Sequence, residues 1–443
     1  MPRRQVLHRY FCDCCAAIVR SFFTLAVASA LLSSVAPAGA QTSPQAKLYA
    51  VNQNGSRNFS ASEVGVLSGL QKGAPVDRDA IQAGADKLAR SGVFSSVRYQ
   101  FATDANGLTV TFQLEDAPLF PVSLDNMPWI SPADLSSALN AANIPFHGGA
   151  PANGTFNDLI AQQLQQMLAA KNIHATVSHA VAATPGTTEQ IIQFTAAGTD
   201  LKLASLQFSD ALAARDSSIQ NTLATIKGRP FSLSAIERFD FANVRPVYLS
   251  HSYLQVQFSA PAVQLSGDNA QVTVAITPGP AYVWGGITWS GNRAYTTADL
   301  NALVSGAGLA NGQPADGTKL EAMWKGVRDA YGHRGYIRAT VEPKESFDAA
   351  SHTAAYAVNI SEGEQFHMGK LVLSGLSIDA ERRLRGAWKL SEGQVFDQTY
   401  ADFFLSKGAA DALKGLPAAQ DKMGSYLQKN PQQHTVDVMI DFE

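Results

Sequence analysis

The segment Gly312-Gln-Pro-Ala-Asp316 decides the fold of this chain, because similar segments recur along it at a nearly constant spacing. In each copy a residue that tolerates left-handed backbone ends one element, and four residues later an Asp, Ser or Asn can cap a new helix. We call this segment the joint and interpret it as the connection between two helices. Successive copies are 80, 75, 84 and 81 residues apart, and the other four are Gly73-Ala-Pro-Val-Asp77, Asn153-Gly-Thr-Phe-Asn157, Gly228-Arg-Pro-Phe-Ser232 and Gly393-Gln-Val-Phe-Asp397.

A constant period of this length indicates tandem modules, and it leaves no stretch over for a separate enzyme domain. The residues around the first joint predict the elements of one module. Residues 48–51 form a short strand pattern, and Ser60-Ala-Ser-Glu63 is a capping box for a first helix. A second helix follows the joint and ends at Gly92, and residues 97–101 and 110–114 then alternate apolar with polar side chains, as a hairpin does.

The predicted order is therefore strand, helix, helix, strand, strand. This order predicts an α+β fold, in which each module is a three-stranded sheet with two helices on one face. The predicted modules are residues 46–117, 120–197, 201–279, 281–364 and 366–443.

The first forty residues form a predicted signal peptide rather than part of the fold. A basic leader precedes an almost uncharged apolar run over residues 21–35, and the small residues Ala38 and Ala40 mark the expected cleavage site. The run is shorter than the roughly 20 residues that a spanning helix needs, so an uncleaved membrane anchor is the less favoured alternative. All three cysteines lie within this leader, so we expect a mature chain without disulfides.

Charge and hydropathy argue against two classes of protein. The chain carries 34 Lys and Arg against 37 Asp and Glu, and removal of the leader leaves a net charge of −6. Nucleic-acid binding calls for a basic face, so this balance argues against it. Residues 41–443 hold no stretch that is long and apolar enough to cross a membrane as a helix.

Several segments resemble POTRA domains, the polypeptide-transport-associated modules of outer-membrane protein assembly factors of the BamA type. The resemblance is specific in the first, fourth and fifth modules and rests on the period in the other two. It implies a chain that recognises unfolded polypeptides and docks proteins. The segments that carry it are Ile287-Thr-Trp-Ser-Gly-Asn292, Gly332-His-Arg-Gly-Tyr336, Val358-Asn-Ile-Ser-Glu-Gly-Glu-Gln-Phe366, Leu371-Val-Leu-Ser-Gly-Leu376 and Leu390-Ser-Glu-Gly-Gln-Val-Phe-Asp397.

Members of that family also carry a C-terminal β-barrel. A sixteen-strand barrel would need on the order of 300 further residues, at roughly ten per strand plus loops. Because the sequence ends at Glu443, directly after the fifth predicted module, we expect this chain to lack the barrel.

No motif in the sequence predicts catalysis, a cofactor or a metal. The glycines at 306, 308 and 312 miss the dinucleotide-binding spacing and lie between two helices rather than after a strand. His174 and His179 are placed on the second strand of module 2, where a spacing of five points them to opposite faces. We therefore expect no enzyme activity, no cofactor and no metal.

The predicted mechanism rests on the edges of the sheets. If the last strand of each module is central, the first and the penultimate strands are edges, and a free edge can pair with any extended peptide. The alternative is that neighbouring modules cover these edges. The candidate binding residues lie in segments 97–101, 253–258 and 336–341, and they are Val97, Tyr99, Phe101, Tyr253, Val256, Phe258, Tyr336, Ile337 and Val341.

The sequence thus predicts a periplasmic scaffold, associated with the outer membrane, that binds extended clients by β-augmentation during outer-membrane protein assembly or export. Its expected partners are unfolded outer-membrane proteins or secreted polypeptides. One alternative is the soluble half of a split transporter whose barrel is a separate chain. A second alternative is an envelope enzyme or ligand-binding protein, which would need a convergent polar pocket.

Overall fold

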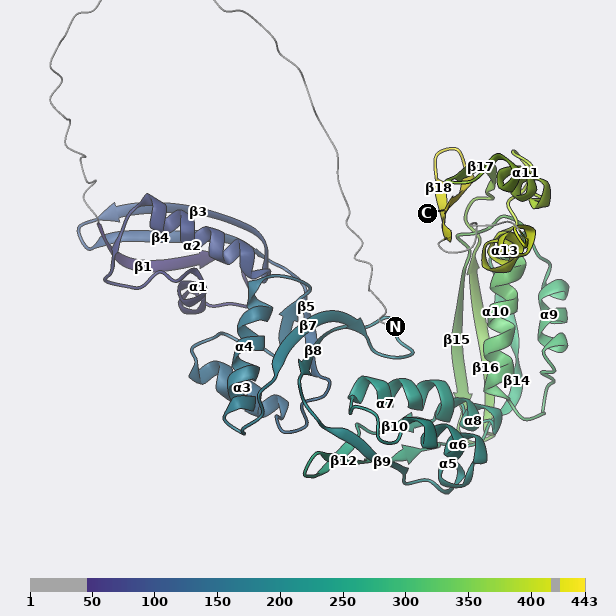
Figure 1. Cartoon of the computed structure of the whole chain (residues 1–443), viewed down its shortest axis with the longest axis horizontal. Coiled ribbons are helices and arrows are strands. Elements are labelled where there is room, and N and C mark those ends of the chain that lie inside the picture. The colour runs from purple at the N-terminus through teal and green to yellow at the C-terminus, as the bar shows by residue number, and fades with distance from the viewer. Residues whose placement is uncertain (1–45, 416–422, 443) are drawn as a thin grey trace, which may run out of the picture.

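The computed structural model describes residues 46–415 and 423–442, and it consists of mixed α+β modules that follow one another along an open arc (Figure 1). Five of its sheets share one strand order, in which the last strand of the module lies between the first strand and the middle strand. The α+β class and the central last strand are confirmed. The predicted signal peptide, with Ala38 and Ala40, lies outside the described residues.

Modules 1 and 2 each contain the predicted helices and strands, with a short extra strand at the joint. Module 1 is built from β1 (Ala46–Asn54), α1 (Ala61–Ser68), β2 (Pro75–Val76), α2 (Arg78–Ser91), β3 (Phe94–Asp104) and β4 (Gly107–Asp116). Module 2 is built from β5 (Leu119–Leu124), α3 (Pro132–Ala141), β6 (Gly149–Pro151), α4 (Thr155–Ala169), β7 (Thr176–Ala183) and β8 (Gln190–Ala197).

Module 3 is the most irregular, because both of its helices are broken and part of its hairpin forms a separate two-stranded sheet. Its helices are α5 (Ala211–Arg215), α6 (Ser217–Ile226), α7 (Leu233–Phe239), the π-helical segment η1 (Asp240–Val244) and α8 (Arg245–Ser250). Its strands are β9 (Lys202–Phe208), β10 (Gln257–Phe258), β11 (Ala262–Ser266), β12 (Asn269–Val274) and β13 (Ile276–Thr277).

Module 4 is the most regular, and module 5 again has a π-helical segment in its second helix. Module 4 is built from β14 (Val283–Ser290), α9 (Thr297–Gly306), α10 (Gly317–His333), β15 (Thr340–Asp348) and β16 (Thr353–Ser361). Module 5 is built from β17 (His367–Ser374), α11 (Ile378–Ala387), α12 (Gln398–Phe403), η2 (Phe404–Gly408), α13 (Ala409–Ala412), β18 (Met423–Asn430) and β19 (Thr435–Phe442).

The central strand of each sheet carries much of its core. In module 1, Val110, Phe112 and Leu114 of β4 are buried against the helices, and they alternate with more exposed side chains. β4 runs parallel to β1 and antiparallel to β3, and the other modules repeat this pairing. Modules 1 and 2 share one continuous hydrophobic cluster, whereas modules 3, 4 and 5 each have their own.

The joint also pairs with the start of the first strand of its own module. In module 4 the N–H of Trp284 donates to the carbonyl of Gln313 (2.7 Å), and the carbonyl of Trp284 accepts from the N–H of Gly312 (2.9 Å). The joint glycines have φ between 73° and 84°, the left-handed turn that brings the joint back onto the strand. The same two-way bond joins Leu48, Leu203 and Met368 to the joints of modules 1, 3 and 5.

The second joint was predicted in the wrong place. The segment that pairs with β5 is β6, and the glycine with the left-handed turn before it is Gly148 (φ 84°), five residues ahead of Asn153. Helix α4 begins at Thr155, so Asn157 lies inside the helix and does not cap it. Instead Asn157 is buried and donates through Nδ2 to the carbonyl of Pro151 (2.9 Å).

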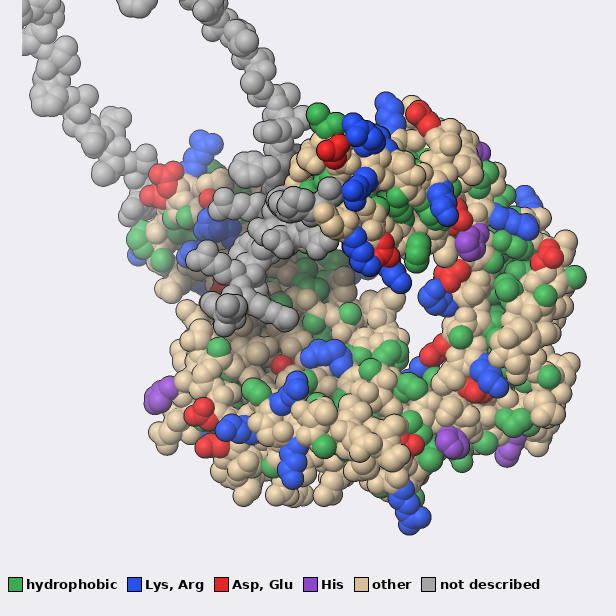
Figure 2. All heavy atoms as spheres, turned by 45° about the vertical axis from the view of Figure 1, so that its right-hand side comes forward, with side chains coloured by type: hydrophobic (Ala, Val, Ile, Leu, Met, Phe, Trp, Pro, Cys, Tyr) green, Lys and Arg blue, Asp and Glu red, His purple; other side chains and the backbone are tan. Residues whose placement is uncertain are grey.

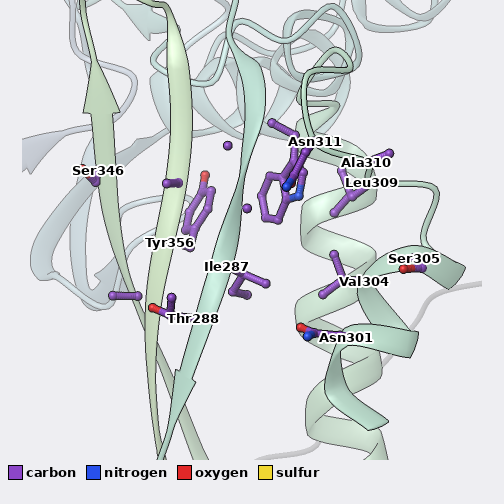
Figure 3. Close-up of a pocket in the computed structure, with 15 residues that line it drawn as sticks. Ile287, Thr288, Asn301, Val304, Ser305, Leu309, Ala310, Asn311, Ser346 and Tyr356 are labelled. Atoms are coloured by element: carbon purple, nitrogen blue, oxygen red, sulfur yellow. The ribbon is translucent and has the colours of Figure 1, made fainter. Parts of the chain in front are cut away.

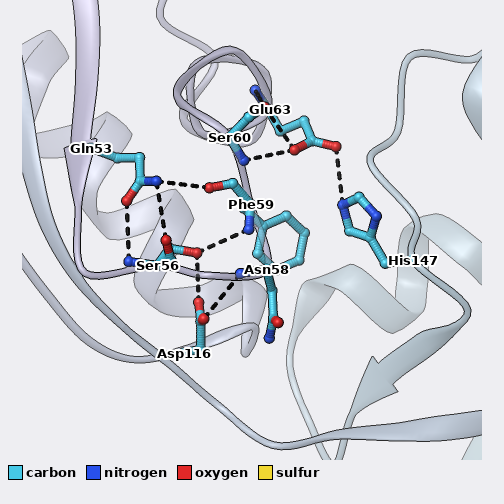
Figure 4. Close-up of polar contacts among 8 residues, drawn as sticks. All are labelled: Gln53, Ser56, Asn58, Phe59, Ser60, Glu63, Asp116 and His147. Carbon is cyan, nitrogen blue, oxygen red and sulfur yellow. Dashed lines mark hydrogen bonds and ion pairs between the residues drawn. The ribbon is translucent and has the colours of Figure 1, made fainter.

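Figure 4 shows polar contacts that close the turn after β1 of module 1 and one contact, between Glu63 and His147, that joins module 1 to module 2. Asp116, at the end of β4, accepts hydrogen bonds from Ser56 Oγ (2.6 Å) and from the N–H of Arg57 (2.8 Å), which closes the turn after β1. Glu63 of α1 contacts Nε2 of His147 in module 2 at 3.0 Å. The turn that ends α2 also lies against module 2, since a Cβ on Gly92 would come within 1.8 Å of the carbonyl oxygen of Asn153.

The later junctions are equally close. At Gly317 of α10, an added Cβ would approach the side chain of Leu249 in module 3 to 2.9 Å. His333, the last residue of α10, contacts Oδ2 of Asp397 in module 5 at 2.9 Å. These contacts place the end of one module's second helix near the second helix of the next.

Candidate peptide-binding edges

The middle strand of each module is an open edge of its sheet. In the described residues, β3, β7, β11, β15 and β18 each pair on one side only, with the central strand of their module. Most of their side chains are exposed or half-buried. An edge of this kind offers N–H and carbonyl groups to another extended chain.

The first predicted edge, residues 97–101, lies within β3. Val97, Tyr99 and Phe101 pair with Leu114, Phe112 and Val110 across the β3–β4 ladder. Val97 and Tyr99 pack against the core, and the Tyr99 hydroxyl donates to Gln82 Oε1 of α2 (2.9 Å). Phe101 is 47% exposed. The backbone of this edge is therefore open, but two of its three predicted side chains face the module's own helices.

The second predicted edge, residues 253–258, is not a continuous strand. Tyr253 and Val256 lie in turns after α8, and only Phe258 reaches a strand, β10, which pairs with β13. All three side chains pack against the core of module 3. The actual edge is β11, which begins at Ala262. The strand prediction was wrong because the apolar side chains of Tyr253 and Val256 pack against the core beside α8. They do not belong to an alternating strand.

The third predicted edge, residues 336–341, begins too early. β15 starts at Thr340, so Tyr336 and Ile337 lie in the turn after α10, and only Val341 is in the strand, opposite Ile360. Tyr336 packs edge-to-face on Tyr331 with ring centroids 6.1 Å apart. Ile337 packs against the core of module 5. Tyr336 therefore packs in the core of module 4, and Ile337 packs at the junction with module 5.

Sequence reasoning missed the edge in module 2. β7 has no Asp, Glu, Lys or Arg, and Val181 on it is 45% exposed. Charged side chains and Pro are the usual protection of an open edge. β15 has both, since Glu342, Pro343 and Lys344 follow one another in it. The absence of charge over residues 176–183 was visible in the sequence and would have identified β7 as an edge less protected than β15.

The structure also bears on the histidine and metal predictions. His174 precedes β7, and only His179 lies on the strand, where its Nε2 is 3.3 Å from Asp158 Oδ1. Across residues 46–415 and 423–442, no three His, Cys, Asp or Glu side chains are grouped as metal ligands would be. None of the described helices has the length and apolar character to cross a membrane.

A group of carboxylates lies where module 2 meets module 3. Asp125, at the end of β5, accepts from Ser232 Oγ (3.0 Å) and from the N–H of Ser234 (2.7 Å). Burial, and then the neighbouring Glu237, raise the pKa of Asp240 in η1 to about 7. Burial and the nearby Asp125 raise the pKa of Glu237 as well. Among the described groups, Asp240 Oδ1 is buried without a hydrogen-bond partner.

Basic and acidic side chains are interspersed on the face shown in Figure 2, without one broad basic surface. On α11, Arg382 contacts Asp379 (3.0 Å) and Arg385 contacts Glu381 (2.8 Å). Exposed pairs of this kind contribute little to stability. They also neutralise much of the charge that an anionic ligand would need on this helix.

Module 4 provides the decisive comparison with known proteins. Residues 282–363 match the family model for POTRA, described as a surface antigen variable number repeat. Module 4 is a POTRA domain. Its strand order recurs in the other four sheets described above, so the described modules share the topology of this POTRA domain.

Relatives of this POTRA array are named as assembly factors. The chain is 24% identical over 221 residues to a candidate outer membrane protein assembly factor of Treponema pallidum, covering 47% of this chain and 26% of that protein. It is 21% identical over 348 residues to the outer membrane protein assembly factor BamA of Nitratidesulfovibrio vulgaris, covering 74% and 42%. The chain therefore spans less than half the length of either relative.

Solved POTRA structures also resemble the chain. The crystal structure of POTRA domains 3–5 of Haemophilus influenzae BamA matches with a TM-score of 0.44 and 22% identity, covering 55% of this chain and 96% of that one.

Proposed function

We propose that this chain is a periplasmic scaffold that docks extended polypeptides on the middle-strand edges of its POTRA modules during outer-membrane protein assembly or export. The observation that carries the proposal is the open edge repeated in the described modules, with β7 free of charged side chains. The class of process is supported by the assembly-factor names of the relatives. The clients are unfolded outer-membrane proteins or secreted polypeptides.

Backbone pairing suits such clients because it makes little demand on their sequence. An added strand gains main-chain hydrogen bonds along the edge, and side chains contribute only at alternate positions. The arc of modules places several edges on one chain (Figure 1). Weak contacts at several edges can then combine into tighter overall binding.

The direct test is photo-crosslinking to an unfolded outer-membrane barrel protein diluted from urea. A photoreactive residue replaces Arg98 in β3 or Ala180 in β7, both exposed on middle-strand edges. The control replaces Ala89, which is exposed on α2 of module 1. We expect capture from the two edge positions and not from Ala89. No capture at either edge would overturn the proposed mode of binding.

A further inference from the structure

A cavity of about 300 Å³ opens where module 2 meets module 3. One wall is the tip of the hairpin between β7 and β8 of module 2, with Thr184 and Pro185. The other walls belong to module 3 and come from α7, from η1 and from residues 258–261, which lead from β10 towards β11. Because both modules contribute, a ligand in this junction cavity would contact the two at once.

The walls of the junction cavity are largely apolar. A Cβ on Gly186 would lie 2.1 Å from Cε2 of Phe241, so the tip of the hairpin lies directly against this ring. Phe241 is nevertheless 40% exposed. The rest of the apolar lining includes Pro185, Phe258 and Pro261. Walls of this kind lower the local dielectric constant, which strengthens any contact between opposite charges made among them.

Two carboxylates lie in this apolar setting, Glu237 of α7 and Asp240 of η1. Asp240 is 4% exposed, and its Oδ1 is buried without a hydrogen-bond partner among the described residues. Burial, and then the charge of Glu237, raise the pKa of Asp240 to about 7. A buried carboxylate without a partner is costly to ionise, so a ligand group that pairs with it would be bound favourably.

Four other cavities of the described chain, in modules 1, 3 and 4, have no Asp or Glu in their lining. The cavity of about 710 Å³ in module 4 is lined by neutral side chains, among them Asn301, Ser305 and Tyr356 (Figure 3). The junction cavity thus differs from these four in chemistry and not only in place.

The cations around the junction cavity leave its negative charge uncompensated. Arg245 lines the cavity, but it forms an ion pair with Glu321 of module 4. Its guanidinium carbon lies 5.2 Å from the centroid of the Phe241 ring. Burial, and then Asp125 of module 2, raise the pKa of Glu237, and the exposed Arg238 offsets only part of this rise.

These groups favour an organic cation over a metal ion. Ca²⁺ takes about six to eight oxygen ligands, and no group of three His, Cys, Asp or Glu side chains in the described chain could hold a metal. A guanidinium or ammonium group needs fewer partners. It donates to one or two carboxylates, and its apolar stem can lie against aromatic and proline walls.

We propose that the junction cavity binds an organic cation, a guanidinium or ammonium group on an apolar stem, which pairs with Asp240 and Glu237 and packs against Phe241. The site lies apart from the paired middle-strand edges and does not depend on the proposed function. The cation can be the side chain of a polypeptide or a free small molecule, since both carry the same chemistry.

The test measures the binding of four probes to the full chain by calorimetry. Butylguanidinium and a capped Gly-Arg-Gly peptide carry the charge, whereas butylurea and a capped Gly-citrulline-Gly peptide keep the shape without it. We expect each charged probe to bind at least about tenfold more tightly than its neutral counterpart, because hydrogen bonds to charged groups are the stronger ones. Tighter binding of the peptide than of butylguanidinium identifies a polypeptide side chain as the ligand, and equal binding identifies a free cation. Equal binding of charged and neutral probes overturns the inference.

Substitutions assign the binding to the junction cavity. Asp240→Asn removes the charge with little change of shape and should weaken binding of butylguanidinium at least about tenfold. Asp268→Asn removes an exposed carboxylate of the same module and should leave binding unchanged. Ala260→Trp fills the cavity from an exposed position and should abolish binding, whereas Asn221→Trp, on an exposed position of α6, should not. Binding that survives both Asp240→Asn and Ala260→Trp overturns the inference.

Binding should also depend on pH, because the cation pairs with the ionised form of Asp240. With a pKa of about 7, roughly one tenth of this carboxylate is ionised at pH 6 and roughly nine tenths at pH 8, so affinity should rise about tenfold. Glu237 acts in the same direction because its pKa is also raised, whereas Arg238 and Arg245 keep their charge over this range. Equal affinity at the two pH values overturns the inference.

Discussion

At the scale of single residues, burial makes the negatively charged form of the Asp240 side chain unfavourable in the folded protein. Its pKa is raised to about 7, chiefly by burial, from an ordinary value of 3.8. The folded protein therefore holds a proton that the unfolded chain releases, so stability falls as pH rises from about 4 to above 7. We expect Asp240→Asn to remove this loss of folding free energy, which is on the order of 4 kcal/mol at pH 8 and close to zero at pH 4. Thermal unfolding, followed at the transition of module 3, measures the difference in stability between Asp240→Asn and the unchanged chain at pH 4 and at pH 8.

The control for this prediction is Asp268→Asn, because Asp268 is exposed in the turn between β11 and β12 of the same module. It should change the unfolding temperature little at either pH. A difference between Asp240→Asn and the unchanged chain that is the same at pH 4 and pH 8 would contradict the assignment of the charge effect to Asp240.

At the scale of elements, the joint depends on its left-handed glycine. Gly312 has φ 73° and open space around a would-be Cβ, so Gly312→Ala meets only backbone strain. That strain is roughly 1–2 kcal/mol. Gly326 lies within α10, also with open space, and there alanine is favoured over glycine by about 1 kcal/mol. We expect chemical denaturation to show Gly312→Ala destabilised and Gly326→Ala stabilised.

The essential outcome is that the two substitutions change the free energy of unfolding in opposite directions. If Gly312→Ala were neutral, the joint would tolerate another turn, and its two-way bond with Trp284 would not need the left-handed residue. The measurement thus tests whether the repeated segment acts through backbone conformation.

At the scale of the whole molecule, the arc depends on close backbone contacts between modules. A Cβ on Gly92 would lie 1.8 Å from the Asn153 carbonyl oxygen, which belongs to the module 2 backbone and cannot swing aside. Gly69 has a similar left-handed φ, but its Cβ would meet only the flexible end of Lys87. We expect Gly92→Ala to broaden the distance distribution between modules 1 and 2, and Gly69→Ala to leave it narrow.

Spin labels can be placed for this measurement because the sequence after residue 40 contains no cysteine. Cysteines at Arg98 of β3 and Ser178 of β7 are exposed and lie in the two modules. Equal distributions for Gly92→Ala and Gly69→Ala would show that the close contact at Gly92 does not fix the junction.

The sequence determined the class of the modules and most of the joints, because these depend on local chemistry. Left-handed glycines, caps such as Asp77 and strand alternation at Val110, Phe112 and Leu114 act over a few residues and can be read directly. The prediction misplaced the second joint because a longer segment separates Gly148 from the start of α4. Only the pairing of β6 with β5 shows where this joint lies.

Only the tertiary structure decided which apolar residues form edges and which pack between elements. Tyr253 and Tyr336 look like strand residues in sequence, yet they pack under helices, because burial against a helix and alternation in a strand select the same side chains. The bulge after Trp284, where the register between β14 and β16 shifts, likewise has no local signal beyond two glycines. The repeat of the fold was thus fixed by local backbone preferences, whereas its open edges were fixed by how distant strands align.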